Sequence, residues 1–159
     1  MGRHVAGTIF FFLVGLRLCA CTRPVRVEGN AMAPTMNDGD RWFVAIAIDD
    51  LKRGDVIEFR YPKDETKHYI ERIIALPGEK IEIRSGKTFI NGQPIVEDYL
   101  DPSFNQAALW FPERVIPNNK FFVMGDNRDN SSDSRYWGPV DRSLIVGKLS
   151  TRYIAGDRK

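Results

Sequence analysis

The stretch DVIEFRYPKDETKHYIERIIALPGEKIEIR, residues 55–84, decides the fold class. It contains three runs rich in β-branched and aromatic residues, 55–61, 68–75 and 80–84, separated by proline, glycine and charged residues. Short runs of this composition bounded by turn residues are typical of β-strands. An earlier run, RWFVAIAI at 41–48, has the same character. We therefore predict a domain built mainly from short strands.

Two dipeptides in this region are predicted hairpin turns, Ser85-Gly86 and Asn91-Gly92. Glycine accepts the positive φ that tight hairpin turns require. No stretch after Val25 shows the long 3.6-residue period of an amphipathic helix. The predicted fold class is therefore mainly β, with an antiparallel β-sheet core.

The composition limits the classes of protein to consider. The chain has 159 residues, of which 43% are hydrophobic and 28% charged, so it can bury a core. The formal net charge is +2, but residues 1–26 hold four arginines and no acidic residue, which leaves −2 for the remainder. A near-neutral body argues against nucleic acid as the main partner. The two cysteines, Cys19 and Cys21, exclude a disulfide framework and a cysteine-rich zinc site, and we predict no metal and no cofactor.

An apolar segment of 17 residues, 5–21, contains a single charge at Arg17. A membrane-spanning helix needs about 20 apolar residues, and Arg17 lies near one end, where a long side chain reaches the headgroups. We predict a single-pass membrane anchor over 1–25, with the lipid bilayer as a partner. A cleaved secretory signal, a lipid-modified Cys21 and a buried core helix are the alternatives, and arginines on both sides of the segment leave its orientation open.

Residues 93–118 differ from the strands around them. They contain four prolines and several aromatic residues, among them Tyr99 and Trp110. We expect a small inserted β subdomain or cap, and a face that touches a membrane or a partner is the alternative. The predicted organisation is an anchor (1–25), a β core (26–92 and 119–153), the inserted subdomain (93–118) and a tail (154–159).

Four segments are specific enough to indicate a family. They are EGNAMAPTM (28–36), RGDV (53–56), YIERIIALPGE (69–79) and GDNRDNSSDSRYWGPV (125–140). In this order, and behind an apolar N-terminal segment, they resemble the bacterial type I signal peptidases. The resemblance covers nearly the whole chain.

This resemblance implies a membrane-anchored β-fold serine endopeptidase that removes signal peptides from exported proteins. Such a protein is expected in the bacterial cell membrane, with its soluble domain outside the cytoplasm. The family uses a serine nucleophile and a lysine base, and the lysine accepts the hydroxyl proton once burial lowers its pKa from about 10.4. The implied partners are signal peptides or other apolar extended peptides with small residues before the cut.

Both catalytic positions of the family pattern carry other residues in this chain. The family has serine before Met in a Ser-Met-x-Pro-Thr pattern, and here that position is Ala31. The family has lysine after Tyr-Ile or Tyr-Val and before Arg, and here that position is Glu71. An alanine methyl can neither attack a carbonyl nor hold an acyl group. We therefore expect a non-cleaving protein that retains a peptide-binding cleft.

Other residues of the matching segments are expected to surround this site. The expected site-supporting residues are Tyr69, Arg72, Ser131, Asp133 and Arg135, and the expected substrate-binding residues are Gly29, Asn30 and Met32. A buried Glu71 would need a proton or a cationic partner. The candidates for that partner are Arg72, Arg128 and Arg135. A displaced nucleophile at Ser131, with Glu71 as its base, is a further alternative.

Three hypotheses for the function follow from these residues. The first, which we favour, is a natural non-cleaving relative that binds peptides of exported proteins. The second is a signal peptidase that is either active in an unexpected way or inactivated by design. In the inactivated form, serine would have been replaced by Ala31 to stop cleavage. The third is a structural β domain on an anchor. Cleavage and peptide binding discriminate among the three.

Overall fold

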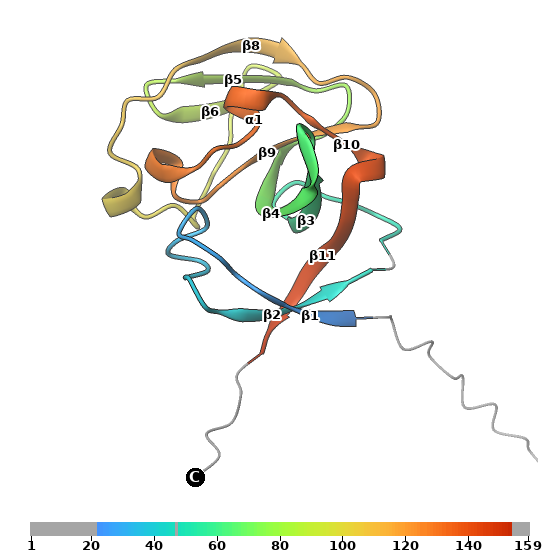
Figure 1. Cartoon of the computed structure of the whole chain (residues 1–159). Helices are drawn as coiled ribbons and strands as arrows, with labels where there is room; N and C mark the ends of the chain where they lie inside the picture. The colour runs from blue at the N-terminus through green and yellow to red at the C-terminus, as the bar shows by residue number, and fades with distance from the viewer. Residues whose placement is uncertain (1–21, 47, 154–159) are drawn as a thin grey trace, which may run out of the picture.

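In the computed structural model, residues 22–46 and 48–153 are described (Figure 1). The predicted membrane anchor lies almost entirely outside these residues, as does the predicted tail. Within the described ranges the longest helix has four residues, and no helix there has the length and apolarity needed to cross a membrane.

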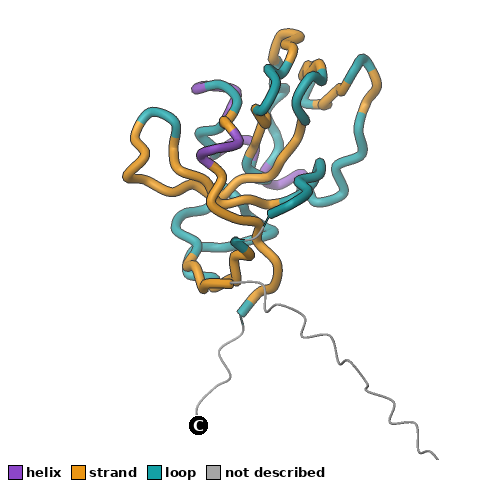
Figure 2. Tube along the Cα trace, turned by 90° about the vertical axis from the view of Figure 1, so that its right-hand side faces the viewer, coloured by secondary structure: helices purple, strands orange, loops and turns teal. Residues whose placement is uncertain are grey.

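Strands make up most of the regular secondary structure of the described residues, in agreement with the antiparallel β prediction (Figure 2). The larger sheet has seven strands in the order β1-β2-β11-β3-β4-β9-β10, with every pair antiparallel. Its strands are β1 (Thr22–Arg26), β2 (Arg41–Ala45), β3 (Val56–Tyr61), β4 (Asp64–Ala75), β9 (Lys120–Met124), β10 (Val140–Asp141) and β11 (Ile145–Arg152).

A second sheet of four strands has the order β7-β6-β5-β8 and lies at the opposite end of the molecule from β1 and β2 (Figure 1). Its strands are β5 (Lys80–Arg84), β6 (Lys87–Ile90), β7 (Gln93–Pro94) and β8 (Phe111–Val115). The predicted insert, 93–118, thus supplies β7 and β8, while β5 and β6 come from the segment before it. The boundary drawn at residue 92 stays a prediction.

The short helices found between residues 22 and 153 all lie after residue 100. They are three 3-10 helices, Pro102–Phe104, Arg128–Asn130 and Arg142–Leu144, and one α-helical turn, α1 (Ser134–Trp137). Asp133 caps α1 by accepting a hydrogen bond from the backbone N–H of Arg135 at 3.1 Å.

The strand predictions agree with the structure in position and differ in extent. β2 ends at Ala45, before the predicted end at residue 48, because its pairing with β1 and with β11 ends at that residue. β4 begins at Asp64 rather than at 68, since it forms a long hairpin with β3. Both predicted turns have two consecutive positive φ angles, 48° and 74° at Ser85-Gly86, which is the geometry of a type I′ hairpin turn.

Three buried clusters form the core. One joins the second sheet to β4 and β9, one lies between β1, β2 and the turn after β1, and one lies between β3, β9 and β10. Ile74, Ile81 and Phe122 are fully buried members of the first cluster, so the two sheets share one apolar interior. This contact places the second sheet against the strand that carries Glu71 and Arg72.

Gly147 allows β11 to lie against β2. A Cβ at this position would approach the backbone oxygen of Ala45 to 2.7 Å, well inside normal contact. We therefore predict that Gly147→Ala lowers the free energy of unfolding by about 1–3 kcal/mol, as overpacking does. Urea denaturation measures the loss. Thr151→Ala, at an exposed position of the same strand, is the control, and an equal effect of both changes would contradict the steric explanation.

Candidate functional site

A groove of about 760 Å³ runs along one side of the larger sheet. One wall is formed by residues 66–71 of β4, and the other by residues 25–32 with the exception of Asn30. Glu58 and Ser132 complete the lining. Ala31 and Glu71, the two positions singled out by the resemblance, therefore lie on opposite walls of one groove.

Both walls present strand edges without a partner among the described strands. β4 pairs with β3 along residues 64–72, but its pairing with β9 on the other side begins only at Arg72. β1 is the outermost strand of the sheet and pairs with β2 alone. Along β4 the groove thus has a strand edge whose backbone groups are available to an extended peptide. On the other wall only Val25 and Arg26 belong to β1, and the backbone N–H and C=O of Val27 are already hydrogen-bonded.

Ala31 lies in a turn that contacts the loop 125–135, which we call the site loop. Its backbone oxygen accepts a hydrogen bond from the N–H of Asn127 at 2.9 Å, and the Asn127 side chain donates to the backbone oxygen of Asn30 at 3.1 Å. Gly125 makes this approach feasible, because a Cβ there would collide with the backbone oxygen of Ala31 and would lie 2.6 Å from the Ser131 Oγ. Asn30 thus anchors the turn through its backbone rather than lining the groove.

Glu71 is buried, with 2% of its surface exposed. Among the described residues it has one hydrogen-bond partner, the Ser131 hydroxyl, which lies 3.3 and 3.4 Å from the two carboxylate oxygens. Burial raises the pKa of Glu71 well above its ordinary value of 4.5, and the nearby Asp133 carboxylate raises it further. Glu71 therefore favours its protonated, neutral form.

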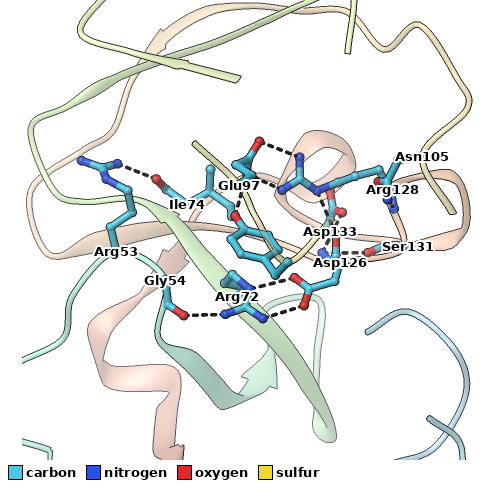
Figure 3. A network of polar contacts seen from close by, with 12 residues as sticks. Arg53, Gly54, Arg72, Ile74, Glu97, Asn105, Asp126, Arg128, Ser131 and Asp133 are labelled. Carbon is cyan, nitrogen blue, oxygen red and sulfur yellow. Dashed lines mark hydrogen bonds and ion pairs between the residues drawn. The ribbon is translucent and has the colours of Figure 1, made fainter. Parts of the chain in front are cut away.

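The three arginines considered as partners for Glu71 bind other carboxylates, and Figure 3 shows two of them, Arg72 and Arg128. Arg72 forms a bidentate ion pair with Asp126 at 2.8 and 2.6 Å and donates to the backbone oxygen of Gly54 at 2.8 Å. The other two pairs are Arg128 with Glu97 and Arg135 with Asp133. No arginine hydrogen-bonds to Glu71 among the described residues. The raised pKa therefore favours protonation over ion pairing as the way in which this carboxyl is kept buried.

The predicted ion pair of Asp133 and Arg135 is present and bidentate, with distances of 2.8 and 2.7 Å. Asp133 is fully buried and also accepts a hydrogen bond from the N–H of Gly125 at 3.3 Å. The Ser131 hydroxyl accepts from the same N–H at 3.2 Å. The supporting residues thus lie behind the groove and hold the site loop in position.

The remaining predicted residues take different places. Met32 is 2% exposed and belongs to the core cluster beneath the groove as well as to its lining. Tyr69 lines the groove and stacks on Tyr61 with ring centroids 4.6 Å apart. Gly29 lines it with a φ of +80°, a backbone conformation that favours glycine.

Sequence reasoning missed a charged cluster in the groove wall. Glu58 is 2% exposed, and its carboxylate binds the Arg23 guanidinium and the Nδ1 of His68, the latter at 2.7 Å. A glutamate inside the apolar run VIEF was the available signal, because an acid within a buried strand requires partners. The partners themselves lie 35 and 10 residues away in sequence.

The burial of Glu71 predicts a pH-dependent effect of Glu71→Gln. In the unfolded chain this carboxyl ionises above about 4.5, whereas in the folded chain it stays neutral to higher pH, so the parent loses stability as the pH rises between the two pKa values. Gln carries no such penalty. We expect Glu71→Gln to stabilise the protein by about 1–3 kcal/mol at pH 8 and by much less at pH 4.

Thermal denaturation at several pH values measures this difference. Glu65→Gln, at an exposed position of the same strand, is the matched control and should show little pH-dependent change relative to the parent. A stabilisation by Glu71→Gln that is the same at pH 4 and pH 8 would show that the carboxyl titrates normally.

Comparison with known proteins places this arrangement in a family. The family described as "Signal peptidase, peptidase S26" matches residues 3–154. A signal peptidase I of Leptolyngbya laminosa is 36% identical over 140 residues, which covers 80% of this chain and 66% of that protein. The signal peptidase IB of Staphylococcus aureus strain COL is 32% identical over 163 residues, covering 91% of this chain and 83% of that protein.

A solved structure supports the same assignment. The crystal structure of a signal peptidase I from Enterococcus faecalis superimposes with a TM-score of 0.57 at 31% sequence identity, covering 65% of this chain and all of that one. The antiparallel β architecture is therefore that of a solved relative as well as that predicted from the strands. On the family match and on these relatives, the chain belongs to the type I signal peptidase family.

Proposed function

We propose that this chain is a natural, non-cleaving signal peptidase-like membrane protein that binds signal peptides or other apolar extended peptides of exported proteins. The observation that carries the proposal is the groove with Ala31 on one wall and a buried Glu71 on the other. These are the positions that the family pattern assigns to the nucleophile and the base. The groove is retained while both reacting groups are replaced.

The chemistry of these two side chains supports the absence of cleavage. The Ala31 methyl has no lone pair with which to attack a carbonyl. Removing a serine nucleophile from a serine protease lowers kcat by a factor on the order of 10⁶ in subtilisin, leaving only the effects of binding and oxyanion contacts. A neutral Glu71 has no tendency to take a proton from a hydroxyl group.

The alternative nucleophile, Ser131, is poorly placed for the role. Its hydroxyl contacts Glu71 at 3.3 Å or more and accepts a hydrogen bond from the backbone of Gly125. A base must lose its own proton before it can accept another, and the raised pKa of Glu71 opposes that step. These contacts support a structural role for Ser131.

The free edge of β4 supports binding of an extended peptide. Residues 66–71 of β4 would span about 20 Å at roughly 3.3 Å per residue, which is enough for a peptide of about six residues. Main-chain hydrogen bonds to such edges supply affinity with little demand on side-chain identity. Val27, Ala31 and Ile70 offer the apolar contacts expected for small side chains.

We further propose that residues 1–25 anchor the protein in the bacterial cell membrane by a single pass. The β core and the inserted subdomain would then lie on the extracytoplasmic side, where exported proteins emerge. The apolar run 5–21 and its junction with β1 at Thr22, one end of the groove-forming strand, support this arrangement. An anchored groove would meet signal peptides while they are still in the bilayer.

The lack of cleavage is tested by incubating a pre-protein with the full chain in detergent micelles. We expect no product from the parent, from Ala31→Ser or from Glu71→Lys alone, because each single change supplies one half of a nucleophile and base pair. The double change should cleave, since the groove and its supporting ion pairs are intact. Product is quantified by gel densitometry and mass spectrometry of the new N-terminus.

The outcomes separate the hypotheses. Cleavage by the unmodified chain would overturn the non-cleaving assignment, and loss of that cleavage in Ser131→Ala would identify Ser131 as the nucleophile. Failure of the double change to cleave, together with failure of the parent to bind peptide, would favour a structural β domain.

Peptide binding is tested separately by fluorescence anisotropy with a labelled signal peptide. Ala31→Phe should weaken binding by at least about tenfold, because a bulky ring would fill the groove; a tenfold loss corresponds to about 1.4 kcal/mol. Ala108→Phe introduces the same ring at an exposed position that does not line the groove and should leave the affinity unchanged. Equal affinities of the two variants would show that the peptide binds elsewhere.

A further inference from the structure

The segment 97–99 contacts both structural elements that meet behind the groove. On one side lies the site loop with Ser131, and on the other lies β4 with Glu71. The hydrogen bond between Ser131 and Glu71 joins these two elements at the groove wall. The segment comes from the predicted insert, far from either element in sequence.

Its contact with the site loop is an ion pair. The Arg128 guanidinium donates to the Glu97 carboxylate, and the exposed fractions of the two side chains are 3% and 6%. Arg128 also donates through Nε to the backbone oxygen of Gly125 at 3.0 Å and accepts at its own backbone oxygen from Arg135 at 3.0 Å. The side chain of Arg128, held by Glu97 (Figure 3), therefore fixes the Gly125 end of the site loop, while its backbone oxygen binds Arg135 at the other end.

Its contact with β4 is made through Tyr99. The Arg72 guanidinium lies over the Tyr99 ring, 4.0 Å from its centroid, a distance suited to a cation–π interaction. The Tyr99 hydroxyl donates to the Glu97 carboxylate at 2.6 Å. Glu97 is thus connected to the site loop through Arg128 and to β4 through Tyr99 and Arg72, the neighbour of Glu71.

The charge of Glu97 fits this role. Burial alone would raise the pKa of Glu97, but the Arg128 guanidinium and the Tyr99 hydroxyl bring it below the ordinary value. The carboxylate is therefore ionised at neutral pH and accepts hydrogen bonds from both partners. By contrast, burial raises the pKa of Glu71, which favours its neutral form.

We propose that Glu97 is a positioning residue that sets the site loop against β4 and thereby shapes the wall of the groove. That it affects peptide affinity rests on the proposed peptide-binding function. That it holds the loop stands on the contacts alone.

Amide hydrogen exchange followed by NMR on the full chain in detergent micelles tests the proposal. In Glu97→Gln the backbone amides of Gly125 and Asn127 should exchange about tenfold faster or more, because local opening of the site loop then costs less free energy. Tyr99→Phe removes only the hydroxyl and keeps the ring beneath Arg72, so a smaller increase is expected. If Glu97→Gln does not fold, the exchange rates of Tyr99→Phe test whether the contacts of Glu97 hold the site loop.

Two references distinguish positioning from general stability. The Asn91 amide donates to Lys80 within the second sheet and should be unaffected; an equal increase at Asn91 would show that Glu97 only stabilises that sheet, and would overturn the proposal. Glu113→Gln breaks an exposed ion pair with Lys80 and should change no site-loop amide.

Peptide affinity of the same variants gives the second readout. Glu97→Gln should weaken binding of the labelled signal peptide by about tenfold, because a loosened site loop must be ordered on binding, while Glu113→Gln should not. A loosened loop with unchanged affinity would overturn the role of Glu97 in shaping the groove. If the parent binds no peptide, the proposed function fails, and the exchange rates still decide whether Glu97 holds the loop.

Discussion

The buried ion pair of Arg72 and Asp126 is the constraint on which the rest of the site depends. It joins β4 to the loop that follows β9, and the Thr35 hydroxyl donates to the same carboxylate. Three segments far apart in sequence therefore converge on one fully buried charge. Loss of one partner from such a pair typically costs 3–5 kcal/mol, because the other charge remains buried. The separation of the two groove walls follows from this pair.

The residues that hold the groove in shape, which we call its frame, differ chemically from the residues that form its wall. The frame consists of charged pairs and backbone hydrogen bonds, among them Asp133 with Arg135 and Asn127 with the turn at Ala31. The wall consists of the groups that a peptide would meet. Ala31 and Glu71 belong to the wall. Ala31 takes part in the frame only through its backbone oxygen, which any residue would provide, and the Glu71 side chain only through its hydrogen bond with Ser131. The family chemistry can therefore be absent from a chain whose family fold is intact.

The sequence predicts the local features well and the long-range ones poorly. Strand positions and the turn at Ser85-Gly86 follow from side-chain alternation and from the backbone freedom of glycine, which are local properties. The shared sheet of β5 and β8 depends on a pairing between segments some 30 residues apart, which periodicity does not contain. Arg128 forms its ion pair with Glu97 and not with Glu71. This pairing depends on side-chain directions that only the folded chain defines.

The surroundings of Glu71 have a consequence for how such a site can diverge. A lysine that serves as a base must be uncharged, and so must a carboxyl group enclosed without a cation. Desolvation opposes ionisation of either group, lowering the pKa of the amine and raising that of the acid. The pocket at position 71 therefore selects for electrical neutrality rather than for the sign of a charge. Replacing lysine by glutamate reverses the charge in water. In this buried site it changes the net charge little, because desolvation favours the neutral form of both side chains.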